Sequence, residues 1–157
     1  MTSSHPKDGF KINSIDPPVA HKFFDLNEPE LTRQEMKTIL ECSPAGIGIV
    51  KNRVLVWTND IFYTMLGYEP DSLKGKNTRI FYADEKEYER VGRDLYANLD
   101  KYGNGLVETR LVRKNGTLFD CRIRASKLIR KDSSQGTIVL ITDISELKML
   151  QLFADDL

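Results

Sequence analysis

The chain has 157 residues, of which 40% are hydrophobic and 29% charged, and this composition is typical of one soluble globular domain. Lysine and arginine together number 23, as do aspartate and glutamate, so no net charge favours binding to nucleic acid or to an anionic membrane. No apolar run approaches the roughly 20 residues of a membrane-spanning helix, and the N-terminus does not resemble a signal peptide. Because Cys42 and Cys121 fit neither a zinc site nor a disulfide framework, we expect a cytoplasmic protein.

Residues 1–26 are polar and interrupted by proline and glycine, which predicts an irregular N-terminal arm. A flanking helix is predicted over residues 27–43, because Asn27 and Glu30 have the spacing of a capping box. This helix carries one apolar stripe, formed by Met36, Ile39 and Leu40. The stripe requires a partner, which is either the domain's own sheet or a second copy of the chain.

Two short strands are predicted next, at Gly46–Lys51 and Val54–Thr58, joined by a tight two-residue turn. Asn59 has the position of a helix N-cap and Gly67 that of a helix stop, so a short helix is predicted between them.

Residues 69–75 predict one further helical turn that ends at a glycine, while residues 77–81 are ambiguous. The longest helix is predicted from Asp84, which has capping-box spacing to Glu87, as far as Gly103.

The final third of the chain is predicted to be β structure. Strands at 106–113 and 117–128 flank Asn115 and Gly116, a pair that favours a type I′ turn with positive φ at both residues. A polar loop is predicted at 131–136. Alternation in the second strand indicates one apolar face, formed by Phe119, Cys121, Ile123 and Ala125.

Residues 137–142 form a continuous β-branched and aliphatic run, which predicts a strand covered on both faces. Asp143 and Glu146 then have capping-box spacing at the start of a last helix. Its apolar residues at helical spacing are Leu147, Leu150 and Phe153. A buried strand that passes directly into an outgoing helix suits the transmission of a change in the core, although an ordinary strand-to-helix junction is the simpler explanation of these residues alone.

The element order predicts an α+β fold, an antiparallel sheet covered by helices on one face. Five fragments add to it: Ile-Val-Lys-Asn-Arg-Val-Leu-Val-Trp-Thr-Asn (49–59), Met-Leu-Gly-Tyr (65–68), Leu-Lys-Gly-Lys-Asn (73–77), Arg-Lys-Asn-Gly-Thr (113–117) and Thr-Asp-Ile-Ser (142–145). In this order and spacing, residues 30–150 resemble a PAS domain of bacterial sensory proteins. The resemblance implies a five-stranded antiparallel sheet with short helices on one face, an N-terminal capping helix and a C-terminal outgoing helix.

The resemblance places a PAS core at residues 44–145 and the start of a signalling helix at 146–157. In the family, the residue that matches Asp143 commonly passes core changes to the effector, so Thr142 and Asp143 are the expected relay residues. The chain is then expected to be a non-catalytic input domain that dimerises through its flanking helices. Its effector would be a two-component histidine kinase or a nucleotide cyclase. One alternative is a ligand-free module that only pairs subunits, and another is a carrier or enzyme on the same fold.

Cofactors are also constrained by the resemblance. The light-sensing flavin subclass requires a cysteine at the position of Thr78, and the haem subclass takes a histidine from the long helix, which has none at residues 84–103. Both histidines, His5 and His21, lie in the N-terminal arm. We therefore expect neither cofactor in those forms, no metal site and no catalytic nucleophile–base pair, while the presence of some other ligand stays open.

The residues expected to face the interior allow two interpretations, a pocket for a small or planar apolar ligand, or ordinary filling of the core. Thr109 and Thr142 are the hydroxyls expected to face inward, whereas Trp57 and Arg110 are expected on the outer sheet face. The candidate pocket residues are Phe62, Met65, Tyr68, Ile80, Tyr88, Val91, Leu95, Thr109, Leu111, Phe119, Cys121 and Leu140.

Overall fold

The structure of the chain is a computed structural model that describes residues 30–129 and 132–156. The chain divides into two compact units, Met1–Arg33 and Gln34–Leu157, and only residues 30–33 of the first are described. The predicted arm at 1–26 and the predicted cap at Asn27 therefore lie outside the described residues.

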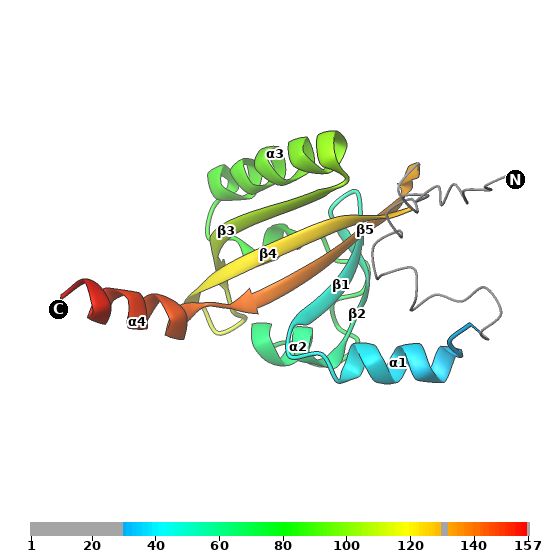
Figure 1. Ribbon diagram of the computed structural model, residues 1–157, viewed down its shortest axis with the longest axis horizontal. Helices are drawn as coiled ribbons and strands as arrows, with labels where there is room; N and C mark the ends of the chain where they lie inside the picture. The colour runs from blue at the N-terminus through cyan, green and yellow to red at the C-terminus, as the bar shows by residue number, and fades with distance from the viewer. Residues whose placement is uncertain (1–29, 130–131, 157) are drawn as a thin grey trace, which may run out of the picture. The chain divides into compact units, whose positions relative to one another are not determined.

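Within the described residues, five strands form one antiparallel sheet in the order β2-β1-β5-β4-β3 (Figure 1). The strand that is last in the chain lies at the centre of the sheet, where Ile141 is opposite Gly46 on one side and Ile123 on the other. The predicted α+β fold with a five-stranded antiparallel sheet is confirmed. The strands are β1 (Gly46–Lys51), β2 (Val54–Thr58), β3 (Asn104–Val112), β4 (Leu118–Ile129) and β5 (Asp132–Asp143).

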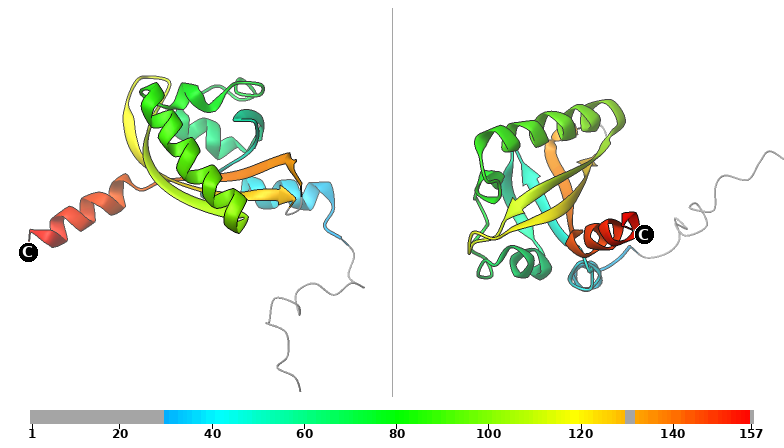
Figure 2. Two further views of the ribbon diagram at one scale, coloured as in Figure 1. Left: turned by 90° about the horizontal axis from the view of Figure 1, so that it is seen from above. Right: turned by 90° about the vertical axis from the view of Figure 1, so that its left-hand side faces the viewer.

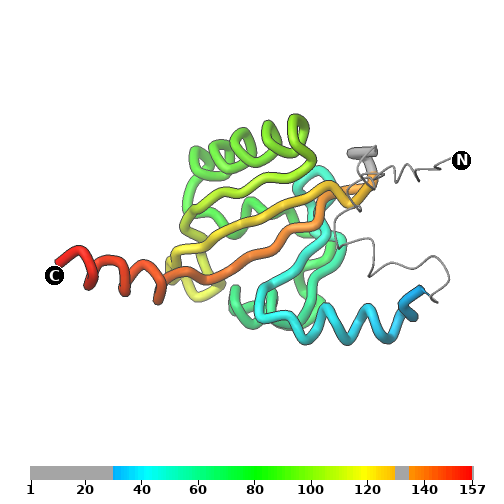
Figure 3. Tube along the Cα trace, viewed as in Figure 1, coloured from blue at the N-terminus to red at the C-terminus, as the bar shows by residue number. Residues whose placement is uncertain are grey.

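The helices between β2 and β3 cover one face of this sheet, whereas the last helix extends away from it, as Figures 2 and 3 show. Phe62, Phe81 and Leu95, from three successive helices, belong to the same buried cluster as the inward side chains of β3 and β4. One face of the sheet therefore carries the core. The helices of the described part are α1 (Arg33–Glu41), α2 (Asp60–Leu66), the 3₁₀ helix η2 (Thr78–Phe81), α3 (Glu85–Tyr102) and α4 (Ser145–Asp155).

Buried side chains alternate with half-buried or exposed ones along β4, which gives the strand an inner and an outer face. Phe119, Cys121, Ile123 and Ala125 are all buried, as predicted, while their neighbours in the strand are half-buried or exposed. Because side chains of a strand alternate between faces, one register of pairing suffices to bury all four.

Of the two predicted hairpin turns, the tight turn at residues 52–53 is confirmed and the turn at residues 115–116 differs from the prediction. Only Gly116 of the Asn115–Gly116 pair has positive φ (89°), and the amide of Gly116 donates to the carbonyl of Arg113 at 2.9 Å. The predicted type I′ turn is therefore wrong there, because the loop has three residues and its last one takes the left-handed conformation. The type I′ geometry occurs instead at Asn52 and Arg53, with φ of 50° and 64°.

Helix ends follow local sequence closely. The Asn59 side chain accepts from the amide of Phe62, and the Asp84 side chain accepts from the amide of Glu87. Gly67 and Gly103 end α2 and α3 in the left-handed conformation, with φ of 77° and 78°. All four positions were predicted from side-chain chemistry alone.

Two helical predictions are wrong. The first helix begins at Arg33 and residues 30–32 are not helical, so the predicted start at residue 27 is too early. Thr32 and Glu35 have the same capping-box spacing as Asn27 and Glu30, which made the start ambiguous in the sequence. Residues 69–75 form turns rather than a helical turn, and Gly75 at φ 82° ends them.

The hairpin of β4 and β5 extends beyond the predicted strand ends. Lys127 lies opposite Thr137, and Ile129 lies opposite Asp132 after a register shift. The predicted loop at 131–136 is therefore wrong for residues 132–136, which belong to β5. The polar residues of this segment do not show the apolar pattern from which a strand is predicted, because pairing of the backbone requires no apolar side chains.

Candidate functional site

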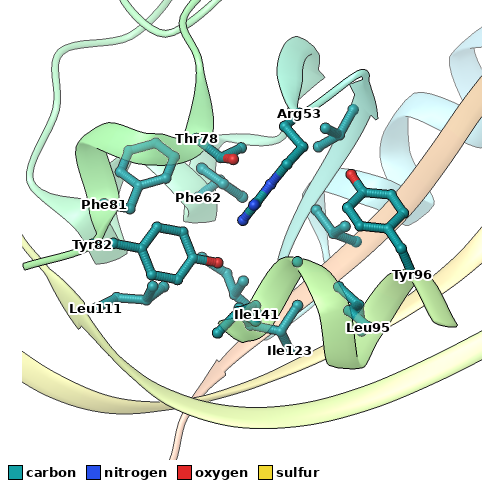
Figure 4. A pocket seen from close by; sticks show the side chains of 14 residues that line it. Arg53, Phe62, Thr78, Phe81, Tyr82, Leu95, Tyr96, Leu111, Ile123 and Ile141 are labelled. Atoms are coloured by element: carbon teal, nitrogen blue, oxygen red, sulfur yellow. The ribbon is translucent and has the colours of Figure 1, made fainter. Parts of the chain in front are cut away.

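A small cavity of about 50 Å³ lies between the helices and the inner face of the sheet (Figure 4). Its walls are mainly apolar, and its polar side chains are those of Arg53, Thr78, Tyr82 and Tyr96. The residues that line it are Val50, Arg53, Phe62, Thr78, Phe81, Tyr82, Val91, Gly92, Leu95, Tyr96, Leu111, Ile123, Val139 and Ile141.

Four of the twelve candidate pocket residues line this cavity: Phe62, Val91, Leu95 and Leu111. The other eight lie elsewhere. Phe119 and Cys121 are buried in the core, Met65 and Tyr68 pack against it, and Ile80 is 42% exposed. Tyr88, Thr109 and Leu140 also lie outside the lining and are described below.

The inward face of β5 differs from the predicted one. Val139 and Ile141 line the cavity, whereas Leu140 between them points to the opposite face and Thr142 is exposed. The expectation that Leu140 and Thr142 face inward is therefore wrong. A continuous apolar run contains no alternation from which its inward face could be inferred. On β3, Arg110 is exposed and lies 3.5 Å from Asp120, as expected for the outer face.

The Cys121 thiol is unreactive in this position. Its side chain is fully buried, and burial raises the pKa of its thiol to about 12. Because the thiolate is the nucleophile and the metal ligand, this cysteine acts as a small core residue.

Thr109 does not face the cavity but binds the long helix. Its hydroxyl donates to Oε1 of Glu87 at 2.6 Å, and Arg90 donates to the same oxygen at 2.6 Å. Two hydrogen bonds lower the pKa of Glu87 from 4.5 to about 2, and the one from Arg90 has a larger effect than the one from Thr109. The carboxylate thus joins α3 to β3.

Replacing Thr109 with valine should lower the free energy of unfolding by about 1.5 kcal/mol at neutral pH, since a hydrogen bond to a charged group is lost. Folding lowers the pKa of Glu87, so its ionised form stabilises the fold above about pH 4.5, and this contribution is lost as the pH falls towards 2. Urea titrations should therefore show the loss shrinking between about pH 4.5 and pH 2, with Thr109→Ser as the control. A loss that stays constant over this range would contradict the role of Glu87.

Arg53 is the main cavity residue that sequence reasoning missed. From the turn between β1 and β2 it extends into the space between Tyr82 and Tyr96 (Figure 4). Its guanidinium carbon lies 3.4 Å from the ring centroid of Tyr88, and its Nη1 donates to the Tyr88 carbonyl at 2.8 Å. The available signal was an arginine at the second turn position, where glycine is the favoured residue.

The two tyrosines beside Arg53 are neutral at physiological pH. Burial raises the pKa of Tyr82 to about 12, against an opposing effect of the Arg53 charge, and burial also raises the pKa of Tyr96. Their hydroxyls therefore remain hydrogen-bond donors.

A second hollow of about 400 Å³ adjoins the cavity and is more polar. It shares Val50, Arg53 and Tyr96 with the cavity, so Arg53 and Tyr96 stand between the two. Its charged side chains are Arg53 together with Lys127 and Asp100, whose Nζ and Oδ1 lie 3.7 Å apart.

The junction between β5 and α4 centres on Asp143. Its Oδ2 lies 3.0 Å from Nη2 of Arg113, and its Oδ1 accepts from the amide of Ser145 at 2.9 Å. The predicted contact of Asp143 with a helix amide is present, although the helix begins at Ser145 and its N-cap is Ile144. Arg113 also donates through Nε to the Met65 carbonyl at 3.1 Å.

Arg113 therefore joins three elements. Its guanidinium carbon lies 4.1 Å from the ring centroid of Phe119, a core residue of β4, while its hydrogen bonds reach the end of α2 and the end of β5. The partner of Asp143 is thus in direct contact with both α2 and Phe119.

Over the residues that the structure describes, no group of three or more histidine, cysteine, aspartate or glutamate side chains could hold a metal ion. Across the same residues, no helix combines the length and hydrophobicity needed to cross a membrane.

Comparison with known proteins gives consistent matches. The family model described as PAS domain matches residues 44–146. The sensor protein TdiS of Thauera aromatica is 26% identical over 121 residues, which are 77% of this chain and 22% of that protein. The chain thus spans about a fifth of the length of this curated relative.

Solved structures share the fold at low sequence identity. A PAS domain of a LuxR-family transcriptional regulator from Burkholderia thailandensis, in complex with ethanol, matches with a TM-score of 0.64 and 23% identity, covering 69% of this chain and 96% of that one. A PAS domain from Colwellia psychrerythraea matches with a TM-score of 0.65 and 13% identity, covering 72% and 97%.

Proposed function

Because this chain belongs to the PAS domain family, we propose that it is the input domain of a signalling protein, in which β5 and Asp143 pass a change in the core to an effector. The observation that supports this most strongly is the position of Asp143. It ends the central strand, whose Val139 and Ile141 line the cavity, and it accepts from the first amide of α4. The experiment that tests the relay compares Asp143→Ala with the unaltered protein for the effector's response to a change in the core.

The start of α4 is held to the sheet by further contacts. The amide of Ile144 donates to the Asp120 carbonyl at 2.9 Å, and Nζ of Lys148 lies 3.5 Å from Oδ1 of Asp120. These contacts involve β4 and the first turn of α4. A shift in the sheet would therefore move the beginning of this helix.

We also propose that the chain pairs with a second copy of itself through its flanking helices. Met36 and Ile39 on α1 are 48% and 57% exposed, and Leu150 and Phe153 on α4 are 61% and 67% exposed. Apolar side chains at helical spacing that lack a partner in the monomer suit a helical dimer interface.

Native mass spectrometry tests both pairing and ligand content. We expect a dimer at micromolar concentration, and Leu150→Glu should convert it to a monomer, since a charge in an apolar interface is costly. Leu118→Glu is the control, because Leu118 is 47% exposed but lies on β4. A monomer in the unaltered chain, or equal effects of both variants, would contradict the interface.

The same measurement separates the two candidate functions. A small molecule released on denaturation favours a ligand sensor, whereas a chain without bound mass favours a module that only pairs subunits. The second candidate has one specific observation in its favour, since a cavity of about 50 Å³ is much smaller than ordinary ligand pockets of roughly 300–1,000 Å³.

We further propose that the sensory core occupies residues 44–145 and that the outgoing helix begins the connection to the effector. This effector is a histidine kinase or a nucleotide cyclase in the cytoplasm. The ethanol complex of the Burkholderia thailandensis PAS domain supports a small ligand as the input. The chain's own role is then sensing, and catalysis belongs to the effector.

A further inference from the structure

The position of Arg53 between an apolar cavity and a polar hollow is unusual. The cavity of about 50 Å³ has apolar walls, while the adjoining hollow of about 400 Å³ contains Lys127 and Asp100. A guanidinium at such a boundary can contact groups on both sides. Among the side chains that the structure describes, the charged ones of the hollow are the positive Arg53 and Lys127 and the negative Asp100.

Two local features of the chain that are unfavourable in themselves meet at the Arg53 side chain. Arg53 has a φ of 64°, a conformation in which glycine or asparagine is usual. Gly92 lies inside α3, where glycine destabilises a helix relative to alanine. A Cβ atom at residue 92 would lie 2.5 Å from Nη1 of Arg53. The absence of a Cβ at Gly92 makes room for the guanidinium in this place.

Arg53 also lacks an anionic partner. Among residues 30–129 and 132–156, no carboxylate forms an ion pair with it, whereas neighbouring Arg79 is paired with Glu85 at 2.9 Å. Its contacts are the Tyr88 carbonyl, the Tyr82 side chain, to which it is hydrogen-bonded, and the faces of Tyr82, Tyr88 and Tyr96. Since a guanidinium has five N–H donors, donors remain for an anion that enters from the hollow.

We propose that this site binds a small amphipathic carboxylate, with its anionic group on Arg53 and its short apolar chain in the cavity. Guanidinium groups bind carboxylates through two parallel hydrogen bonds. The neutral hydroxyls of Tyr82 and Tyr96 are further donors beside Arg53. The cavity of about 50 Å³ has room for about three groups of the size of a water molecule or a methylene, at roughly 15 Å³ each, which with the carboxyl carbon favours an aliphatic acid of four carbons in all. This inference rests on the proposed sensory function and specifies its ligand class.

Isothermal titration calorimetry of the 157-residue chain with sodium acetate, propionate, butyrate and pentanoate tests the proposal. Ionic strength is held constant with sodium chloride. We expect affinity to rise about fourfold for each added methylene as far as butyrate and then to stop rising. Butyrate should bind at least tenfold more tightly than 1-butanol, because only the carboxylate pairs with Arg53.

Variants locate the binding site. Arg53→Gln should weaken butyrate binding at least tenfold and leave 1-butanol binding equal or stronger. Arg79→Gln is the matched control and should leave both unchanged, because Arg79 lies 4.7 Å from the ring centroid of Tyr88 but does not line the cavity. If Arg53→Gln does not fold, the comparison of butyrate with 1-butanol in the unaltered chain decides, together with a butyrate-induced shift of the Arg53 Nε–H resonance.

Three results would overturn the proposal: no binding of butyrate at tens of millimolar, equal binding of butyrate and 1-butanol, or undiminished binding in Arg53→Gln. Arg53 would then only attach the β1–β2 turn to α3. Such a failure is distinct from failure of the sensory function, since binding is measured without an effector. If the chain binds carboxylates but the effector responds equally in Asp143→Ala and in the unaltered protein, the relay is contradicted. The proposed ligand class is then still supported.

Discussion

Replacing Asn59 with alanine should lower the free energy of unfolding by about 4 kcal/mol, since it removes several buried hydrogen bonds at once. The residue is fully buried, and its side chain uses its whole hydrogen-bonding capacity. Oδ1 accepts from the amides of Ile47 and Phe62 at 2.9 and 3.2 Å, and Nδ2 donates to the carbonyls of Leu40 and Ala45 at 2.8 and 3.2 Å.

This one amide joins the end of α1 to β1 and to the start of α2. Alanine leaves four backbone groups without their partner, and burial makes each loss costly. Urea unfolding followed by circular dichroism measures the effect. Asn77→Ala is the control, because Asn77 also caps a helix but is exposed, and it should cost about 1 kcal/mol. Equal losses for the two variants would show that the buried network does not stabilise the domain.

Replacing Asp143 with alanine should leave the domain folded and abolish the effector's response to changes in the core. The pair with Arg113 is partly exposed, with 29% of the arginine side chain and 36% of the aspartate side chain accessible. Such pairs contribute up to about 1 kcal/mol, and the hydrogen bond from the Ser145 amide adds about 1 kcal/mol. The expected loss of stability is therefore about 1–2 kcal/mol, too little to unfold a domain of ordinary stability.

Two further variants separate the interactions of Asp143. Asp143→Asn keeps an acceptor for the Ser145 amide but removes the charge that pairs with Arg113. The effector's response to a change in the core should therefore be reduced in this variant rather than lost. Asp94→Ala is the control, because Asp94 is an exposed aspartate on α3 that pairs with Arg90 at 3.2 Å and lines neither the cavity nor the hollow. Equal responses in Asp94→Ala and Asp143→Ala would indicate a general effect of lost charge.

Features that depend on neighbouring residues were predictable from the sequence. The caps at Asn59 and Asp84 and the stops at Gly67 and Gly103 follow from side-chain chemistry within one helical turn. The apolar face of β4 follows from alternation along a single strand. The fold class came from the order of these local elements.

Features that depend on long-range packing were not predictable in this way. The pairing of β5 with β1 and β4 determines which of its side chains face inward. Because its apolar run is continuous, the sequence does not show which of the two sets of alternating side chains this is. Arg53 looked like a turn residue, and only the approach of Gly92 on α3, 39 positions along the chain, places its side chain at the cavity. Asp143 was identified from the sequence, whereas its partner Arg113, 30 residues away, required the structure.

The most direct test of the relay measures the activity of the proposed effector in four forms of the protein: unaltered, Val91→Ala, Asp143→Ala and both together. Val91→Ala changes the cavity lining without touching the junction, so no knowledge of the natural ligand is needed. Coupling of the size usual between linked sites predicts that Val91→Ala shifts activity about fivefold or more when Asp143 is present, and not at all in Asp143→Ala. The same shift in both backgrounds would show that the core reaches the effector without Asp143, and would contradict the account.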